Sequence, residues 1–170
     1  MNQDNMQHGF TWQGQDVTGW IATEKFDGIR AYWDGQTMWT RGGNAVPIPQ
    51  EWIDALPRGV HLDGEIFAGY GKRKLAEGFA KRGENSKDCA FKAFDAPMVA
   101  GGYAKRLASI EHGFIVQSME SVTIAGIDEA AKMVRHVQYF GGEGLILRHP
   151  ELAYTPGRTD RLLKLKTWEI

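Results

Sequence analysis

The sequence predicts an α+β domain with largely antiparallel sheets flanked by helices. Short β-prone runs and helix-like segments follow one another without a regular βαβ alternation. An Asp-Gly pair at 34–35 separates two β-prone runs, a pattern typical of a hairpin. With 170 residues, 42% of them hydrophobic, the chain can bury the core of one domain.

The pattern of apolar and turn-forming residues places the elements in order. Strands are expected at 19–23, 29–33, 37–41, 60–68, 90–95, 114–118, 122–125, 145–148 and 162–166. Helices are expected at 49–56, 72–82, 103–111 and 128–139, the last of them capped by Asp128. We expect residues 1–18 to be a polar N-terminal extension, with 2–7 disordered, and 19–170 to be the domain.

Composition limits the function classes. Lys and Arg total 20 against 21 Asp and Glu, so any contact with nucleic acid must use a local patch. The single cysteine, Cys89, allows neither an intramolecular disulfide nor a zinc site built from thiolates alone, and we expect it to be buried. No apolar run reaches the length of a membrane span, which favours a cytoplasmic protein without a membrane partner.

The stretch from Lys25 to Arg30 reads Lys-Phe-Asp-Gly-Ile-Arg and has the form K-x-D-G-x-R. Nearby cations and partial desolvation can turn a lysine into a nucleophile at neutral pH. Asp27 is placed to orient the amine or hold a metal, and Gly28 permits a tight turn and close ligand approach. The alternative is a surface lysine beside an ordinary turn.

Two acidic segments are candidate ligand sites. Asp63 and Glu65 flank a glycine in a predicted strand, so both project to one face, where they suit a metal or ribose hydroxyls. Glu143 precedes an apolar strand and suits Mg²⁺, which takes few protein carboxylates together with phosphate oxygens. Solvent-facing acidic residues are the alternative in both cases.

An aromatic and a lysine pair complete the series. Phe94, near a strand end, can stack on a nucleobase, although most strand phenylalanines are core residues. Alternation places Lys164 and Lys166 on one face, where a polyphosphate between them would relieve their repulsion. An edge strand protected from aggregation by its lysines is the alternative.

Together and in this order, these segments resemble the covalent nucleotidyltransferase superfamily of ATP-dependent DNA ligases, RNA ligases and mRNA capping enzymes. Thr-Arg-Gly-Gly at 40–43 resembles the short arginine motif of that family, and Glu-Gly-Leu-Ile-Leu-Arg at 143–148 its fourth motif. The residues within these motifs are most similar to those of compact bacterial or phage DNA ligases. The resemblance implies an ATP-grasp-like adenylation (nucleotidyltransferase) domain acting on ATP and nicked double-stranded DNA with Mg²⁺ or Mn²⁺.

The resemblance also implies roles for single residues. Lys25 would attack the α-phosphate of ATP and carry AMP. Phe94 would stack on adenine, while Glu65 would hold the ribose and assist Glu143 with the metal. The remaining implied roles are adenine recognition near Thr23 and Glu24, ribose or 5′-phosphate contact by Arg30, 5′-phosphate binding by Arg41, α-phosphate binding by Lys164 and Lys166, and support from Asp27 and Asp63.

The lengths of chain before Lys25 and after Lys166 lead to further expectations about domains and cofactor. The chain stops four residues after Lys166, so we expect no OB-fold domain in it. Only 24 residues precede Lys25, too few for the extra domain of NAD-dependent ligases, and ATP is therefore favoured. We expect a monomer.

Two other readings stay open. An RNA ligase or a capping enzyme is one, although capping enzymes tend to carry a tryptophan where this chain has Leu165. A nucleotide- or nick-binding module without turnover is the other, with phosphate contacts from basic clusters at 72–74, 81–82 and 105–106.

Overall fold

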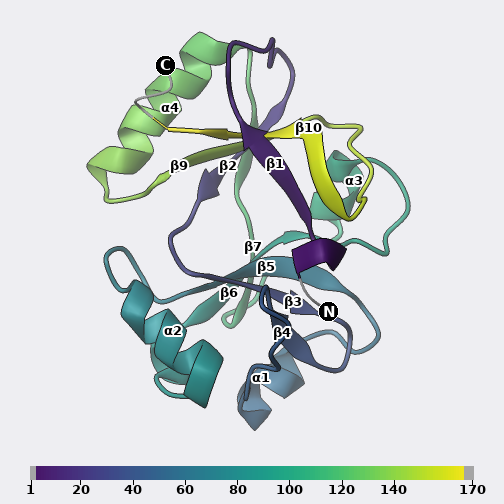
Figure 1. Cartoon of the computed structure of the whole chain (residues 1–170), viewed down its shortest axis with the longest axis vertical. Helices are drawn as coiled ribbons and strands as arrows, with labels where there is room; N and C mark the ends of the chain where they lie inside the picture. The colour runs from purple at the N-terminus through teal and green to yellow at the C-terminus, as the bar shows by residue number, and fades with distance from the viewer. Residues whose placement is uncertain (1–2, 167–170) are drawn as a thin grey trace.

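The computed structural model describes residues 3–166, which form two five-stranded sheets joined by short connections. The upper sheet in Figure 1 contains β1 (Gln7–Thr11), β2 (Ile21–Lys25), β8 (Ser121–Thr123), β9 (Gly144–Arg148) and β10 (Gly157–Leu165). Its strand order is β1-β10-β9-β2-β8, and all neighbours are antiparallel except the parallel pair β1 and β10.

The lower sheet contains β3 (Ile29–Trp33), β4 (Met38–Thr40), β5 (Leu62–Phe67), β6 (Ala90–Asp95) and β7 (Val116–Ser118). Its order is β4-β3-β5-β6-β7, with only β6 and β7 parallel. The helices are α1 (Gln50–Ala55), α2 (Arg73–Arg82), α3 (Tyr103–Ala108) and α4 (Ile127–Tyr139), and the 3₁₀ turns are η1 (Gln3–Asn5) and η2 (Ser86–Asp88). Figure 1 shows α4 beside the upper sheet and α1 and α2 below the lower one.

Side-chain alternation decides which face of the upper sheet is core. Leu163 and Leu165 on β10 are fully buried and pack with Leu147 on β9 and with Val134 on α4. Because successive strand residues point to opposite faces, Lys164 faces away from α4 and toward the lower sheet. The same period therefore builds a core on one side of the sheet and presents polar groups on the other.

The lower sheet follows the same rule. Ala31 and Ala93 are fully buried in the core that includes Trp52 of α1 and Phe79 of α2, whose ring centroids are 4.5 Å apart. Arg30 precedes Ala31 and Phe94 follows Ala93, so these polar and aromatic side chains project from the opposite face, toward the upper sheet. The polar faces of the two sheets thus meet.

The predicted fold class is confirmed, because the sheets are mostly antiparallel and helices cover them. The Asp34-Gly35 hairpin is also present, with β3 and β4 antiparallel and Trp33 paired with Met38. Asp34 Oδ1 accepts hydrogen bonds from the backbone N–H groups of Gln36 and Thr37, which fixes the turn.

The predicted Asp128 cap is wrong. Helix α4 begins at Ile127 after Gly126, and no side chain caps it. The Glu129 carboxylate instead accepts a hydrogen bond of 2.6 Å from the N–H of Ala125, one residue before the cap. Asp128 lies within the first helical turn, where its charge still complements the helix dipole.

The largest departure from the expected fold is β1. Residues 2–7 were expected to be disordered, yet Met6 and Gln7 are buried and Gln7 begins a strand. A Cβ on Gly9 would lie 1.9 Å from the carbonyl oxygen of Leu162, so only glycine permits β1 to lie this close to β10. This polar segment becomes a strand because β10 offers it an edge to pair with.

Other parts of the chain refine the expectations. Cys89 is buried as predicted, and burial raises the pKa of its thiol to about 11.

Arg106, expected in a basic surface cluster, is instead buried, with 1% of its surface exposed. It forms a bidentate ion pair with Asp95, so it cannot contact DNA. Among residues 3–166, no helix combines the length and apolar character needed to cross a bilayer.

Candidate active site

A cleft of about 430 Å³ lies between the two sheets, and both contribute its walls. This volume falls within the usual range of small-molecule sites. Of the residues predicted for the site, the cleft is lined by Thr23, Glu24, Lys25, Arg30, Arg41, Glu65, Phe94 and Lys164. The sheets therefore bring together residues separated by up to about 140 positions in sequence.

The K-x-D-G-x-R segment connects the two sheets. Lys25 is the last residue of β2 in the upper sheet, and Arg30 is the second residue of β3 in the lower one. Between them, the N–H of Gly28 donates a 3.0 Å hydrogen bond to Glu65 Oε1, and a Cβ at Gly28 would lie 2.1 Å from the Ile66 carbonyl oxygen. The glycine is needed because the crossing chain lies directly against β5.

Lys25, Glu143 and Lys166 form an ion triple at the adjoining ends of three strands. Lys25 Nζ lies 2.5 Å from Glu143 Oε2, and Lys166 Nζ lies 2.5 Å from Glu143 Oε1. Burial alone would raise the pKa of Glu143, but the hydrogen bonds from Lys166 and Lys25 hold it below its ordinary value. The carboxylate thus stays ionised between two amines at the edge of the cleft.

A row of side chains leads from this triple along the upper wall. Thr23, Ile146 and Lys164 are paired across β2, β9 and β10, and all three line the cleft. Burial lowers the pKa of Lys164, and the charge of Lys25 lowers it further, as do Arg158 and Arg41. The wall is consequently a concentration of positive charge that suits a polyanion.

The lower wall carries Glu65, which faces the same cleft. Burial raises the pKa of this carboxyl to about 7, although the Gly28 N–H and the charge of Lys25 oppose the change. A carboxyl in this state can accept or donate a hydrogen bond near neutral pH, as a ribose hydroxyl requires.

Asp63 does not reach the cleft. It is fully buried and holds Arg30 in a bidentate ion pair, with Nη2 2.6 Å from Oδ2 and Nε 3.0 Å from Oδ1. The hydroxyl of Tyr154 donates a 2.7 Å hydrogen bond to the same carboxylate. Both oxygens are therefore engaged, and Asp63 fixes the orientation of Arg30, which lines the cleft.

Phe94 lines the cleft, and two arginines lie near its ring. The Cζ of Arg148 lies 4.8 Å from its ring centroid and that of Arg30 lies 5.3 Å away, both within cation–π range. Arg148 also lies 4.8 Å from the ring centroid of Tyr103, and it donates to Thr23 Oγ1. These contacts hold the phenyl ring as a flat wall of the cleft.

Asp27 and Glu24, on either side of Lys25, do not contact its amine in the structure. Asp27, expected to orient the Lys25 amine, is instead ion-paired with Arg73 at 2.8 Å, and both side chains are about half exposed. Glu24 accepts a 2.9 Å hydrogen bond from the hydroxyl of Tyr70, and burial raises the pKa of its carboxyl. The partner of the Lys25 amine in the structure is Glu143.

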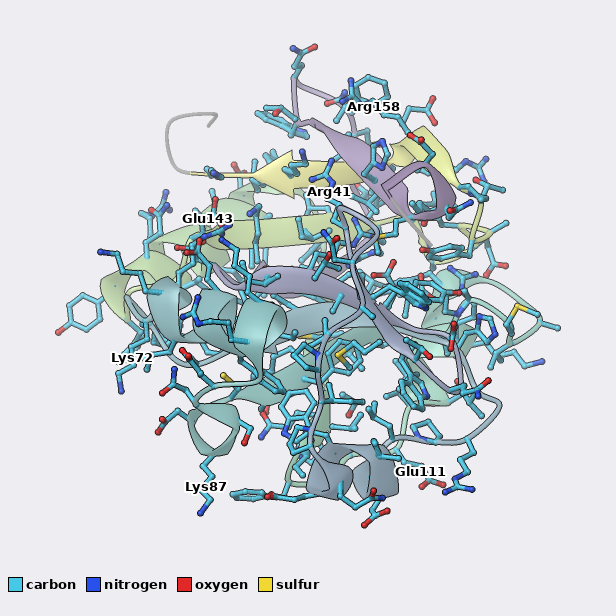
Figure 2. The ribbon with its side chains drawn as sticks, turned by 60° about the horizontal axis from the view of Figure 1, so that its bottom comes forward. Arg41, Lys72, Lys87, Glu111, Glu143 and Arg158 are labelled. Atoms are coloured by element: carbon cyan, nitrogen blue, oxygen red, sulfur yellow. The ribbon has the colours of Figure 1, made fainter. Side chains whose placement is uncertain are left out.

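The loop after β4 brings Arg41 to the mouth of the cleft. Figure 2 shows Arg41 on a loop that rises toward the upper sheet, on the side where Arg158 lies, whereas Glu143 is found toward the other side. Sequence reasoning did not identify Arg158 or His8, which also line this mouth. They had no local signal, because β1 and the first half of β10 were not predicted as strands.

The carboxylates of the cleft fit a sparsely held cation. Within residues 3–166, no group of three or more His, Cys, Asp and Glu side chains could hold a metal by itself. Glu143 does not line the cleft itself, but its partly exposed carboxylate contacts Lys25, which does, and Glu65 lies on the lower wall. Mg²⁺ commonly accepts one or two carboxylates and completes its shell with phosphate oxygens and water, so these residues fit it.

Comparisons with known proteins agree with the motifs. No protein-family model matches the chain. A curated DNA ligase from Haemophilus influenzae is 27% identical over 165 residues, which cover 92% of this chain and 61% of that protein. The chain thus spans about three fifths of the length of this relative.

Solved structures share the fold over nearly the whole chain. A Lig E DNA ligase superposes with a TM-score of 0.83 at 26% identity, covering 96% of this chain and 68% of that one. The Chlorella virus DNA ligase-adenylate gives 0.77 at 22% identity, covering 95% and 68%. The ATP-dependent DNA ligase of bacteriophage T7, in complex with ATP, gives 0.64 at 15% identity, covering 96% and 69%. The resemblance is confirmed: this chain is related to DNA ligases and has the nucleotidyltransferase fold of the ATP-dependent enzymes.

Proposed function

We propose that the chain is the adenylation domain of an ATP-dependent DNA ligase, with Lys25 as its nucleophile. The single observation that carries the proposal is the Lys25 amine, held by Glu143 at the edge of a cleft whose walls supply cations, an aromatic ring and a carboxyl. Nζ attacks the α-phosphorus of ATP, an N–P bond forms, the bond to the β-phosphate oxygen breaks, and pyrophosphate leaves. AMP then passes to the 5′-phosphate of nicked DNA, and attack by the 3′-hydroxyl seals the strand and releases AMP.

The ion triple explains how Lys25 can become a nucleophile. An ammonium group has no lone pair, so Nζ must lose a proton before or during attack. Glu143 Oε2, which accepts a hydrogen bond of 2.5 Å from Nζ, is placed to receive that proton. Lys166 on the other carboxylate oxygen balances the charge of Glu143 and provides a second cation beside the reacting phosphate.

The remaining walls match the parts of ATP. Phe94 offers a ring for stacking on adenine, and Glu65 lies where a ribose hydroxyl can bond. Lys164 and Arg41 are cations on the same cleft and suit the phosphates of ATP and the 5′-phosphate of the nick. Thr23 and Glu24 line the same cleft beside Lys25, and we assign them to recognition of the base edge.

A divalent cation, Mg²⁺ or Mn²⁺, would be held by Glu143 with help from Glu65. When bound, it would neutralise charge that develops on the phosphates during transfer. Lys164 and Lys166 act in the same direction, because preorganised cations stabilise such charge without reorganisation. We further propose that the protein acts as a monomer.

Incubation with α-³²P-ATP and Mg²⁺, followed by a denaturing gel, tests the proposal. We expect a labelled band from the wild-type chain and none from Lys25→Ala. Lys87→Ala is the matched control, because Lys87 is an exposed lysine far from Glu143 in Figure 2. A label retained by Lys25→Ala would refute the assignment of the nucleophile.

Two further arms separate the competing readings. Labelling from α-³²P-GTP in preference to ATP would favour a capping-type enzyme. Pre-adenylated nicked duplexes, one of DNA and one with an RNA strand at the nick, test the later step without the first. Absence of both label and sealing would favour a binding module without turnover.

A further inference from the structure

His8 is placed at the mouth of the cleft by a strand that the sequence did not reveal. It lies on β1, where it is paired in register with Arg158 of β10, and it lines the cleft together with Arg158 and Arg41. In parallel strands, paired residues project to the same side of the sheet. The imidazole and two guanidinium groups therefore surround one end of the cleft.

The imidazole is incompletely satisfied in this position. Its Nδ1 atom is buried and has no hydrogen-bond partner within residues 3–166. A buried polar atom left unpaired is destabilising, so a group that hydrogen-bonds to this ring when a ligand binds would relieve that cost. This is the one buried side-chain N or O atom in the described chain that lacks a partner.

The charges around His8 favour an anion as that partner. Burial lowers the pKa of His8, and Arg41, Arg30 and Arg158 lower it further, while the Met6 carbonyl acts in the opposite direction. Burial and the neighbouring positive charges therefore favour the neutral ring in the absence of an anion.

Only one of these three arginines is balanced by an acid. Arg30 is paired with Asp63, to which Tyr154 also donates. Neither Arg41 nor Arg158 is ion-paired with a carboxylate in the part of the chain that the structure describes. An arriving anion would meet two uncompensated guanidinium groups and an imidazole that can take up a proton.

We propose that His8 completes, with Arg41 and Arg158, a site for a phosphate group of the nicked DNA strand, and that occupation of the site is coupled to proton uptake by His8. The inference rests on the proposed function for the identity of the ligand. Bound phosphate would favour the imidazolium, which adds a charge-assisted hydrogen bond to those of the two arginines. One coupled proton would weaken binding by up to about tenfold for each pH unit between the free and the bound pKa of His8.

Fluorescence anisotropy tests this coupling with the full chain in EDTA and without ATP, so that no reaction follows binding. Dissociation constants for nicked duplex DNA are measured from pH 6.5 to 8.5 at fixed salt, because salt alone changes such affinities. Over this range a terminal phosphate, whose second pKa is about 6, stays mostly dianionic. We expect the wild-type affinity to fall with rising pH and the His8→Gln variant to lose up to one proton of that dependence.

The controls identify the source of the phosphate and the specificity of His8. A nick with a 5′-phosphate is compared with one bearing a 5′-hydroxyl: a His8-dependent slope in both assigns an internal phosphodiester, and a slope in the first alone assigns the terminal phosphate. His112→Gln is the matched variant, because His112 is exposed and lines a different cavity. It should keep the wild-type slope.

Equal slopes for the wild type and His8→Gln would overturn the role of His8 and leave the proposed ligase function intact. Failure of the wild type to bind nicked DNA at any pH would count against both. Should His8→Gln not fold, NMR titration of the wild-type imidazole gives an independent answer. Its pKa must rise when 5′-phosphorylated nicked DNA or inorganic phosphate is added, and an unchanged pKa would overturn the proposal.

Discussion

Replacing Glu65 by Gln is expected to change how the stability of the protein depends on pH. Burial raises the pKa of this carboxyl from its ordinary 4.5 to about 7 in the folded protein. Between these values the folded state binds more protons than the unfolded chain, so the free energy of unfolding falls as pH rises through this window. A pKa difference of this size corresponds to about 3 kcal/mol. Glutamine keeps an oxygen for the Gly28 N–H and has no proton to lose.

Urea denaturation of both proteins at pH 5 and pH 8.5 measures the effect. The variant should gain about 3 kcal/mol relative to the wild type between the two pH values, because contributions from all other groups cancel in the comparison. Glu111→Gln, which removes an exposed carboxylate (Figure 2), should show no such gain. Parallel pH profiles for Glu65→Gln and the wild type would refute the reasoning that burial of Glu65 favours its protonated form.

Three further substitutions test the ion pair that holds Arg30 and the aromatic wall of the cleft. Asp63→Asn should lower the free energy of unfolding by roughly 3 kcal/mol in urea denaturation, because it leaves the charge of Arg30 uncompensated. Tyr154→Phe removes the hydrogen bond to the same carboxylate and the one accepted from the Gln7 N–H, and it should cost about 1–2 kcal/mol because no charge is left uncompensated. Equal losses for the two variants would argue against a special role for the ion pair. Phe94→Leu should raise the ATP concentration needed for half-maximal labelling of Lys25 by roughly tenfold, the lower end of the range for loss of a base-stacking ring. An unchanged ATP requirement would show that Phe94 does not stack on adenine.

Strands were predictable from the sequence wherever apolar and polar residues alternate. Leu163 and Leu165 predicted the core face of β10, and the structure buries both. β1 was missed because its polar residues show no alternation, and because it is a strand only by virtue of pairing with β10. The tendency of β1 to form a strand therefore depends on its partner β10 and cannot be read from the residues of β1 alone.

The candidate site was predictable as a set of residues but not as a set of contacts. Glu143 was expected beside a metal, and the structure shows it between Lys25 and Lys166. Asp27 was expected near Lys25, and it is paired with Arg73. Which side chains meet depends on the register of strands far apart in the chain, and no local pattern encodes that register.

The sequence by itself predicted the fold class, the relation to DNA ligases and eight of the residues that line the cleft, because ordered motifs and strand alternation are local properties of the chain. Only the tertiary structure showed that Asp63 is ion-paired with Arg30 and that Arg106 is buried against Asp95. It also placed His8 beside Arg41 and Arg158 at the mouth of the cleft. These relations arise where the two sheets face each other, so they follow from three-dimensional packing and cannot be read from neighbours in sequence.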